Sequence, residues 1–362
     1  MNLAAVDQIA KAVLYEGYML YPYRPSSIKN RQRWNFGVLC PPSYCEAHPG
    51  SELCAMQTEC LLAGGPQAAL EVRVRFLQLV ARSVAKLAAP ARELPTEESS
   101  QFIRVPRLEV DGRIYQPWQE AVEREVALPA CRPNALTQES LSLNFMFPAA
   151  KNVEGLRDAE GCLAVVIIRE QSALHGVVEV KTLPMGAELF KINVQVRNLT
   201  RCADPEQHSR EDALLGSLIS THIVLGAQNA RFWSLLDPPE DIREISTACR
   251  NLGTWPVLVG REGTGDTLLS SPIILYDYPQ IAPESAGDLF DGTEIDEILS
   301  LRIMTLTDEE KREMRQSDDR ARQMLERTET LPMEQLMKLH GAMRSLRPVD
   351  PDGREHVKEE TR

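Results

Sequence analysis

Four cysteines near the N-terminus are the first residues whose types and spacing could support chemistry. They are separated by four, eight and five residues, with His48 among them: Cys40, Cys45, Cys54 and Cys60. Four thiolates can hold a tetrahedral zinc ion, but structural zinc sites normally use C-x2–4-C pairs, and these spacings are wider. Cys60 also lies in an apolar run, where a thiol behaves as a small hydrophobic side chain. We therefore favour thiols without a metal and keep a Zn or Ni site as the alternative.

A second candidate is the acidic segment 268–299, which carries seven carboxylates and no Lys or Arg. An EF-hand calcium loop needs its glycine at position six. With Gly292 there, positions three and twelve would hold Leu289 and Ile298, which cannot be ligands. The register excludes an EF-hand, so we interpret the segment as an acidic face that contacts cations.

Segment 17–36 has the opposite character, because it is basic and aromatic and contains no acidic residue. Pro22 and Pro25 prevent a continuous helix, so we predict an extended arm. Its cations either contact the chain's own acidic segment or form, together with that segment, a polar surface for a partner protein. The predicted binding surface consists of Tyr23, Arg24, Lys29, Arg31, Arg33, Trp34, Asp277, Asp288 and Asp291.

No motif of a known catalytic class is present. The chain has no G-x-S-x-G, H-E-x-x-H or kinase signature, and the glycines at 260–265 lack the Lys-Ser/Thr of a P-loop. His222 lies in an apolar run and is interpreted as a core histidine. An enzyme would require His222 to converge with a carboxylate such as Asp237 or Asp277 in one pocket, so we favour a protein that is not an enzyme.

Charge and composition exclude further classes. The 362 residues carry a formal net charge of −12, with a pI near 5.2, which argues against binding to duplex nucleic acid or to anionic lipid. No uncharged run approaches the length of a membrane span, and Asp7 and Lys11 interrupt the first apolar pattern, unlike a signal peptide. We expect a cytoplasmic bacterial protein.

The elements that must position these residues are mainly strands. Residues 70–76 and 189–199 alternate between apolar and polar, Asp111-Gly112 is typical of a type I′ hairpin turn, and 163–168 is a buried strand. Gly64–Pro66 is predicted to be a hairpin loop. Because no crossover helix separates the strands, we predict a mainly β (α+β) fold with a large antiparallel β-sandwich-like body.

The predicted boundaries follow from composition. A short helix spans 1–16, and a β-rich body spans 17–286, with a Pro- and Glu-rich linker near 88–101. The acidic loop and C-terminal helices occupy 287–346, where Thr307 and Glu310 form a capping box that opens a helix reaching about 328. Residues 347–362 are polar and predicted to be disordered.

Several phrases, taken together, resemble a bacterial protein family, with no assigned reaction, that is associated with gene clusters for NiFe hydrogenases and their maturation factors. They are YEGYMLYPYRPSSIKNRQRWNFG, MQTECL, RFWSLLDPPE, CRNLGTWPVLVG and SSPIILYDYPQIAPESAGDLFDGTEIDEIL. The resemblance covers about residues 15–310 and implies a context rather than a mechanism, so no functional residue is carried over.

The sequence therefore predicts a non-catalytic accessory or scaffold protein that acts through protein–protein contacts in hydrogenase assembly or maturation. Its partner would be a hydrogenase subunit or a maturation factor. Two alternatives stay open: a metal-handling protein that uses the cysteine cluster, and an enzyme of unknown reaction.

Overall fold

The structure of the protein is a computed structural model that describes residues 6–7, 9–10, 14, 35–89, 92–95, 102–280, 303–317, 319–330 and 332. Over these residues the fold is mainly β, as predicted, with an eleven-stranded antiparallel sheet and a separate two-stranded hairpin. The strands are β1 (Ala55–Leu87), β2 (Phe102–Val105), β3 (Leu108–Val110), β4 (Arg113–Tyr115), β5 (Trp118–Ala127), β6 (Leu141–Phe147), β7 (Ala150–Arg157), β8 (Leu163–Gln171), β9 (Leu174–Pro184), β10 (Leu189–Asn198), β11 (Ile219–Trp233), β12 (Trp255–Leu258) and β13 (Thr267–Ser271).

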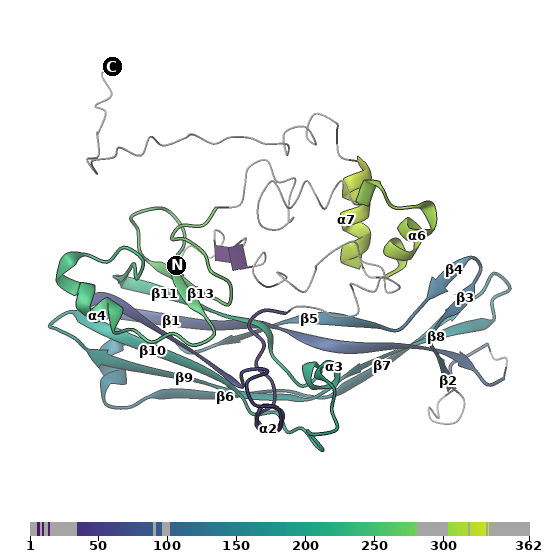
Figure 1. Cartoon of the computed structure of the whole chain (residues 1–362), viewed down its shortest axis with the longest axis horizontal. Helices are drawn as coiled ribbons and strands as arrows, with labels where there is room; N and C mark the ends of the chain where they lie inside the picture. Colours follow the sequence, from purple (N-terminus) through teal and green to yellow (C-terminus); the bar gives the residue numbers. More distant parts are fainter. Residues whose placement is uncertain are drawn as a thin grey trace.

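Strand β1 is the spine of the sheet. Its 33 residues, at about 3.3 Å each, correspond to roughly 100 Å. Because β10 and β11 both pair with residues 61–63 of β1, they lie on opposite edges of it. Further along, β5 and then β2 continue the β10 edge, while β8 continues the β11 edge. One strand therefore joins the two ends of the elongated sheet (Figure 1).

The predicted hairpin loop at Gly64–Pro66 is wrong, because β1 continues through it. The pairing with β11 shifts register between Gly64 and Ala69, opposite Asn229, whose φ of 52° lies in the left-handed region. A Cβ on Gly64 would lie 2.6 Å from the Cβ of Ala230, so this close approach requires glycine. The two glycines and the proline therefore produce a bulge inside a strand rather than a turn between two strands.

Other strand predictions are confirmed. Asp111 and Gly112 both have positive φ and join β3 to β4, as a type I′ turn requires. The predicted strand at 189–199 is β10, which pairs with β9. The apolar run at the start of β8 is buried on both faces, except for the half-buried Ala164.

The main core lies between two layers of the sheet. The strand order is β12-β13-β11-β1-β10-β9-β6, and it folds over so that rings of β6 contact β1, with which β6 does not pair. Residues of β1, β6, β9, β10 and β11 form one cluster there. Even-numbered residues of β1 and β10 point into this core, including Phe76, whose ring lies 5.8 Å from that of Phe145 and 5.9 Å from that of Phe147. Strict alternation in the sequence thus becomes one buried and one outward face.

Short helices lie between the strands in the chain and pack against the sheet. They are α2 (Pro42–Ala47), η2 (Pro133–Thr137), α3 (Arg210–Leu214), η3 (Glu240–Ile242), α4 (Arg243–Thr247), α6 (Asp308–Ser317) and α7 (Asp319–Thr330). Thr307 and Glu310 form the predicted capping box, with Glu310 Oε2 accepting from the Thr307 amide at 2.7 Å. The single helix predicted from there to 328 is instead the pair α6 and α7. Among the described residues, no helix is long and apolar enough to cross a membrane.

Candidate functional site

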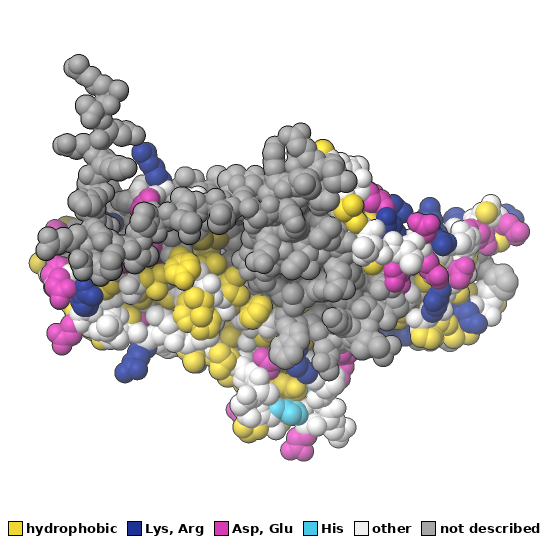
Figure 2. Space-filling view, turned by 45° about the horizontal axis from the view of Figure 1, so that its top comes forward, with side chains coloured by type: hydrophobic (Ala, Val, Ile, Leu, Met, Phe, Trp, Pro, Cys, Tyr) yellow, Lys and Arg dark blue, Asp and Glu magenta, His cyan; other side chains and the backbone are white. Residues whose placement is uncertain are grey.

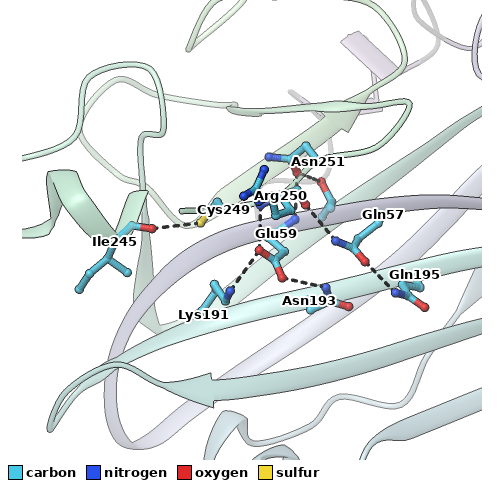
Figure 3. A network of polar contacts seen from close by, with 10 residues as sticks. Gln57, Glu59, Lys191, Asn193, Gln195, Ile245, Cys249, Arg250 and Asn251 are labelled. Atoms are coloured by element: carbon cyan, nitrogen blue, oxygen red, sulfur yellow. Dashed lines mark hydrogen bonds and ion pairs between the residues drawn. The ribbon is translucent and has the colours of Figure 1, made fainter. Parts of the chain in front are cut away.

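The outer face of β1, β10 and β9 carries rows of polar side chains. The side chains of even-numbered residues of β1 and β10 point into the core here, so those of the odd-numbered residues point outward. The register aligns them in two rows: Glu59, Asn193 and Lys181 in one, and Gln57, Gln195 and Glu179 in the next. Figure 3 shows the part of this arrangement that surrounds Glu59.

Glu59 is the centre of the network. Its carboxylate accepts hydrogen bonds from Lys191 Nζ at 3.2 Å, Asn193 Nδ2 at 3.1 Å and the Arg250 amide at 2.8 Å (Figure 3). Burial raises the pKa of this carboxyl group, but the three hydrogen bonds and the Lys191 charge outweigh burial, and the net pKa is lowered. Glu59 is therefore an ionised, satisfied acceptor at neutral pH rather than a proton donor.

The loop 249–254 is tied to β1 beside Glu59. Asn251 Oδ1 accepts from the Glu59 amide at 2.9 Å and from Thr58 Oγ1 at 3.1 Å, and Gln57 and Leu252 exchange backbone hydrogen bonds. Beneath the loop, the buried hydroxyl of Ser270 is hydrogen-bonded to those of Thr58 and Thr254. The loop therefore continues the sheet along the part of β1 that β11 does not reach.

An open groove of about 360 Å³ runs along this face. Lysine and glutamate side chains line it together with amides, and Lys191 Nζ forms an ion pair with Glu59 at 3.2 Å. No histidine or cysteine is among its lining residues. The nearby Cys249 thiol has its pKa raised to about 11, mainly by burial and then by the Glu59 charge, so it stays protonated and is a poor nucleophile. The described lining residues of the groove are mostly polar or charged, so it can bind a polar partner.

Most of the predicted binding surface lies outside the described residues, namely Tyr23, Arg24, Lys29, Arg31, Arg33, Trp34, Asp288 and Asp291. Asp277 is described, and it follows β13. Its carboxylate accepts from the Leu258 amide at 2.7 Å and from Ser234 Oγ at 2.5 Å. This carboxylate is thus occupied by contacts within the chain.

The structure separates Cys60 from the other three predicted cysteines, whereas Cys45 lies close enough to Cys40 and Cys54 for both to raise its pKa. Cys60 of β1 is fully buried in the main core. Cys40 belongs to a different buried cluster, which also contains Tyr44 of α2. Burial is the main cause that raises the thiol pKa to about 11 for Cys40 and about 12 for Cys45, and it also raises that of Cys60. Within the described ranges, no group of three or more His, Cys, Asp or Glu residues could hold a metal ion.

His222 is buried, as the sequence predicts. Its Nδ1 contacts the Ser220 carbonyl oxygen at 2.9 Å, and burial is the main cause that lowers its pKa to about 4. The charged groups that influence it are Arg75 and Glu125. Among the described residues, no hydrogen bond joins His222 to Asp237 or Asp277.

Sequence reasoning missed the Glu59 network because its members come from positions 57–59, 191–195 and 249–252. The available signal was a single charged residue, Glu59, within the otherwise uncharged run AMQTECLLA. A carboxylate in such a run is buried only if partners satisfy it, and the partners are visible only in the folded chain. Comparison of the sequence with models of protein families found no match, and comparison with curated proteins found none either.

Proposed function

We propose that this protein is a non-catalytic accessory or scaffold protein that acts through protein–protein contacts in the assembly or maturation of a NiFe hydrogenase. The hydrogenase context comes from the sequence resemblance alone. The structural support concerns the mode of action, which is binding to another protein without chemistry at the bound site.

The observation that carries the proposal is a group of exposed apolar side chains around β12. We define this β12 surface as Leu252, Trp255, Ile274 and Tyr276, whose exposed fractions are 49, 44, 75 and 85%. Trp255 opens β12, Leu252 precedes it, and the segment after β13 returns along it to bring Tyr278 to Leu258. Figure 2 shows hydrophobic side chains gathered on one face of the molecule. Exposed aromatic and large aliphatic residues are typical of protein interfaces.

The polar site supports the same conclusion by contrast. A catalytic carboxylate needs a pKa matched to proton transfer, but the pKa of Glu59 is lowered and its oxygens accept three hydrogen bonds. This pattern is typical of a structural network. For the metal-handling alternative, Cys45 lies near Cys40 and Cys54, but Cys60 packs in a different cluster, and the described residues contain no group of three or more His, Cys, Asp or Glu that could hold a metal ion.

Affinity capture would test the proposal. The tagged chain is expressed in cells that make the hydrogenase, beside a Trp255→Ser/Tyr276→Ser variant and an Ile103→Ser control. Ile103 is 46% exposed in β2, near the far end of β1. We expect the wild type and the control to recover a hydrogenase subunit or maturation factor. The double variant should recover at least about fivefold less of it, because aromatic residues contribute much of the binding energy of an interface.

Recovery of no hydrogenase component by the wild type would contradict the proposal. Equal recovery by the double variant would remove the β12 surface from it. Thermal unfolding of all three proteins checks that each is folded.

A further inference from the structure

The outer edge of β6 has backbone groups that no described strand uses. Strand β6 ends the strand order, and β9 is the strand it pairs with. Leu199 donates its amide to the His175 carbonyl oxygen at 2.8 Å, so odd-numbered β9 residues bond to β10. In an antiparallel pair the bonding direction alternates, so even-numbered β9 residues bond to β6.

The register then identifies the free groups. The even-numbered residues of β9 lie opposite Leu141, Leu143, Phe145 and Phe147. The amide and carbonyl groups of the residues between them, Ser142, Asn144 and Met146, therefore face away from β9. All three of these residues are exposed, and Met146 is 61% exposed. Strand β6 contains neither a proline nor a charged residue, which are the usual protections of a free edge.

A groove of about 540 Å³ extends from Asn144 of β6 across the end of β9 to the segment after β10. Asn144 of β6, His175 of β9, and Leu199 and Arg201 after β10 are among its lining residues, and none of the lining residues is a carboxylate. His175 and Arg201 are exposed, and neither side chain forms a hydrogen bond or ion pair with another described residue. The net charge of the chain is −12, but the lining of this groove includes the cation Arg201 and no carboxylate. The groove therefore favours a negatively charged ligand.

We propose that the β6 edge and this groove bind an extended acidic segment of a partner protein, which adds to the sheet as a strand beside β6. The partner backbone bonds to Ser142, Asn144 and Met146, and its carboxylates lie in the groove near Arg201. Main-chain bonds of this kind provide affinity, and alternate side chains provide specificity. This inference rests on the proposed function, because it names a surface and a class of partner for it. A second copy of this chain fits less well, because β6 carries no carboxylate to offer Arg201.

The test uses the full chain and two blocked, fluorescein-labelled heptapeptides, in which valine alternates with glutamate or with lysine. Fluorescence anisotropy compares the wild type with Asn144→Pro, which removes an edge-facing amide, and with Asn144→Ala, which retains it. An Arg201→Glu variant tests the charge. We expect the dissociation constants of the glutamate peptide for the wild type and for Asn144→Ala to agree within about twofold. For Arg201→Glu, the dissociation constant should be at least about tenfold higher than for the wild type. Binding to Asn144→Pro should be lost.

Equal binding of the glutamate peptide to Asn144→Pro, or equal binding of the lysine peptide to the wild type, would overturn the inference. A wild-type dimer that Asn144→Pro converts to a monomer would assign the edge to a second copy and would also overturn it. Failure of the proposed function can be distinguished from failure of this inference. If only the proposed function fails, the wild type recovers no hydrogenase component in the capture experiment but still binds the glutamate peptide. If capture succeeds equally with Asn144→Pro, only the β6 inference fails.

Discussion

The two ends of the strand order, β12 and β6, differ in what they leave exposed. At β12, Pro256 has no amide, and the amide and carbonyl of Leu258 are bonded to Asp277 and Tyr278. At β6, the backbone of Ser142, Asn144 and Met146 faces away from the only strand beside it in the described chain. The β12 end therefore presents apolar side chains over a closed backbone, whereas the β6 end presents an open backbone. A partner can recognise the first only through side chains and the second through main-chain hydrogen bonds.

The largest expected effect comes from proline at adjacent positions of β6. Leu143 faces Val178 of β9, so Leu143→Pro removes a sheet hydrogen bond and should lower the free energy of unfolding by about 2–3 kcal/mol. Asn144→Pro removes only an edge-facing amide and should cost less than about 1 kcal/mol. Urea unfolding of both variants measures the difference. Equal losses would show that the edge of β6 is not open as the register indicates.

The next effect concerns Glu59, which holds the loop leading into β12. Glu59→Ala leaves Lys191 and the Arg250 amide without their acceptor and should cost about 2 kcal/mol at pH 7. Because the pKa of Glu59 is lowered in the folded state, its contribution is complete above the unfolded pKa of about 4.3 and is lost as the pH falls through the folded pKa.

The matched variant Glu59→Gln removes this titration. The difference in unfolding free energy between the wild type and Glu59→Gln should therefore shrink as the pH falls below about 4.3. A difference that is constant from pH 7 to pH 3 would mean that Glu59 is not stabilised as a carboxylate.

Opening the β12 end should have a smaller effect. Asp277→Ala removes the acceptor of the Leu258 amide and should cost about 1–2 kcal/mol. Hydrogen exchange at the Leu258 amide should become faster, while exchange in β6 stays unchanged, because the two ends are separate. Unchanged exchange at Leu258 would show that Asp277 does not close this edge.

The smallest effect on stability is expected at the β12 surface itself. Tyr276 is 85% exposed, so Tyr276→Ser should change the free energy of unfolding by less than about 0.5 kcal/mol. Chemical unfolding of this variant measures the change. A loss comparable to that of Asp277→Ala would mean that Tyr276 is part of the fold and not of a binding surface.

Much of the fold followed from local patterns. Alternation at 70–76 and 189–199 identified strands and their inward faces, because the side chains of a strand point to opposite sides in turn. The Asp111-Gly112 turn and the Thr307 capping box were also predictable, since each depends on a few adjacent residues. The Gly64–Pro66 prediction failed because a bulge and a turn use the same residue types.

The candidate site could not be predicted in the same way. Glu59 and Arg250 are 191 positions apart, and the loop that supplies the Arg250 amide has no motif of its own. The cysteines show the converse, because nearness in sequence did not always become nearness in space: Cys40 and Cys60 pack into different clusters. The spacing of residues in the sequence can predict a metal site only when the ligands lie on one local structural element.

The sequence by itself determined the β class, the inward face of each alternating strand and the helix start at Thr307, because these depend on periods and caps of a few residues. The tertiary structure decided which strands border β1, which carboxylates are satisfied, and which sheet end is left open. Those outcomes depend on register, and a register becomes definite only when two distant segments pair.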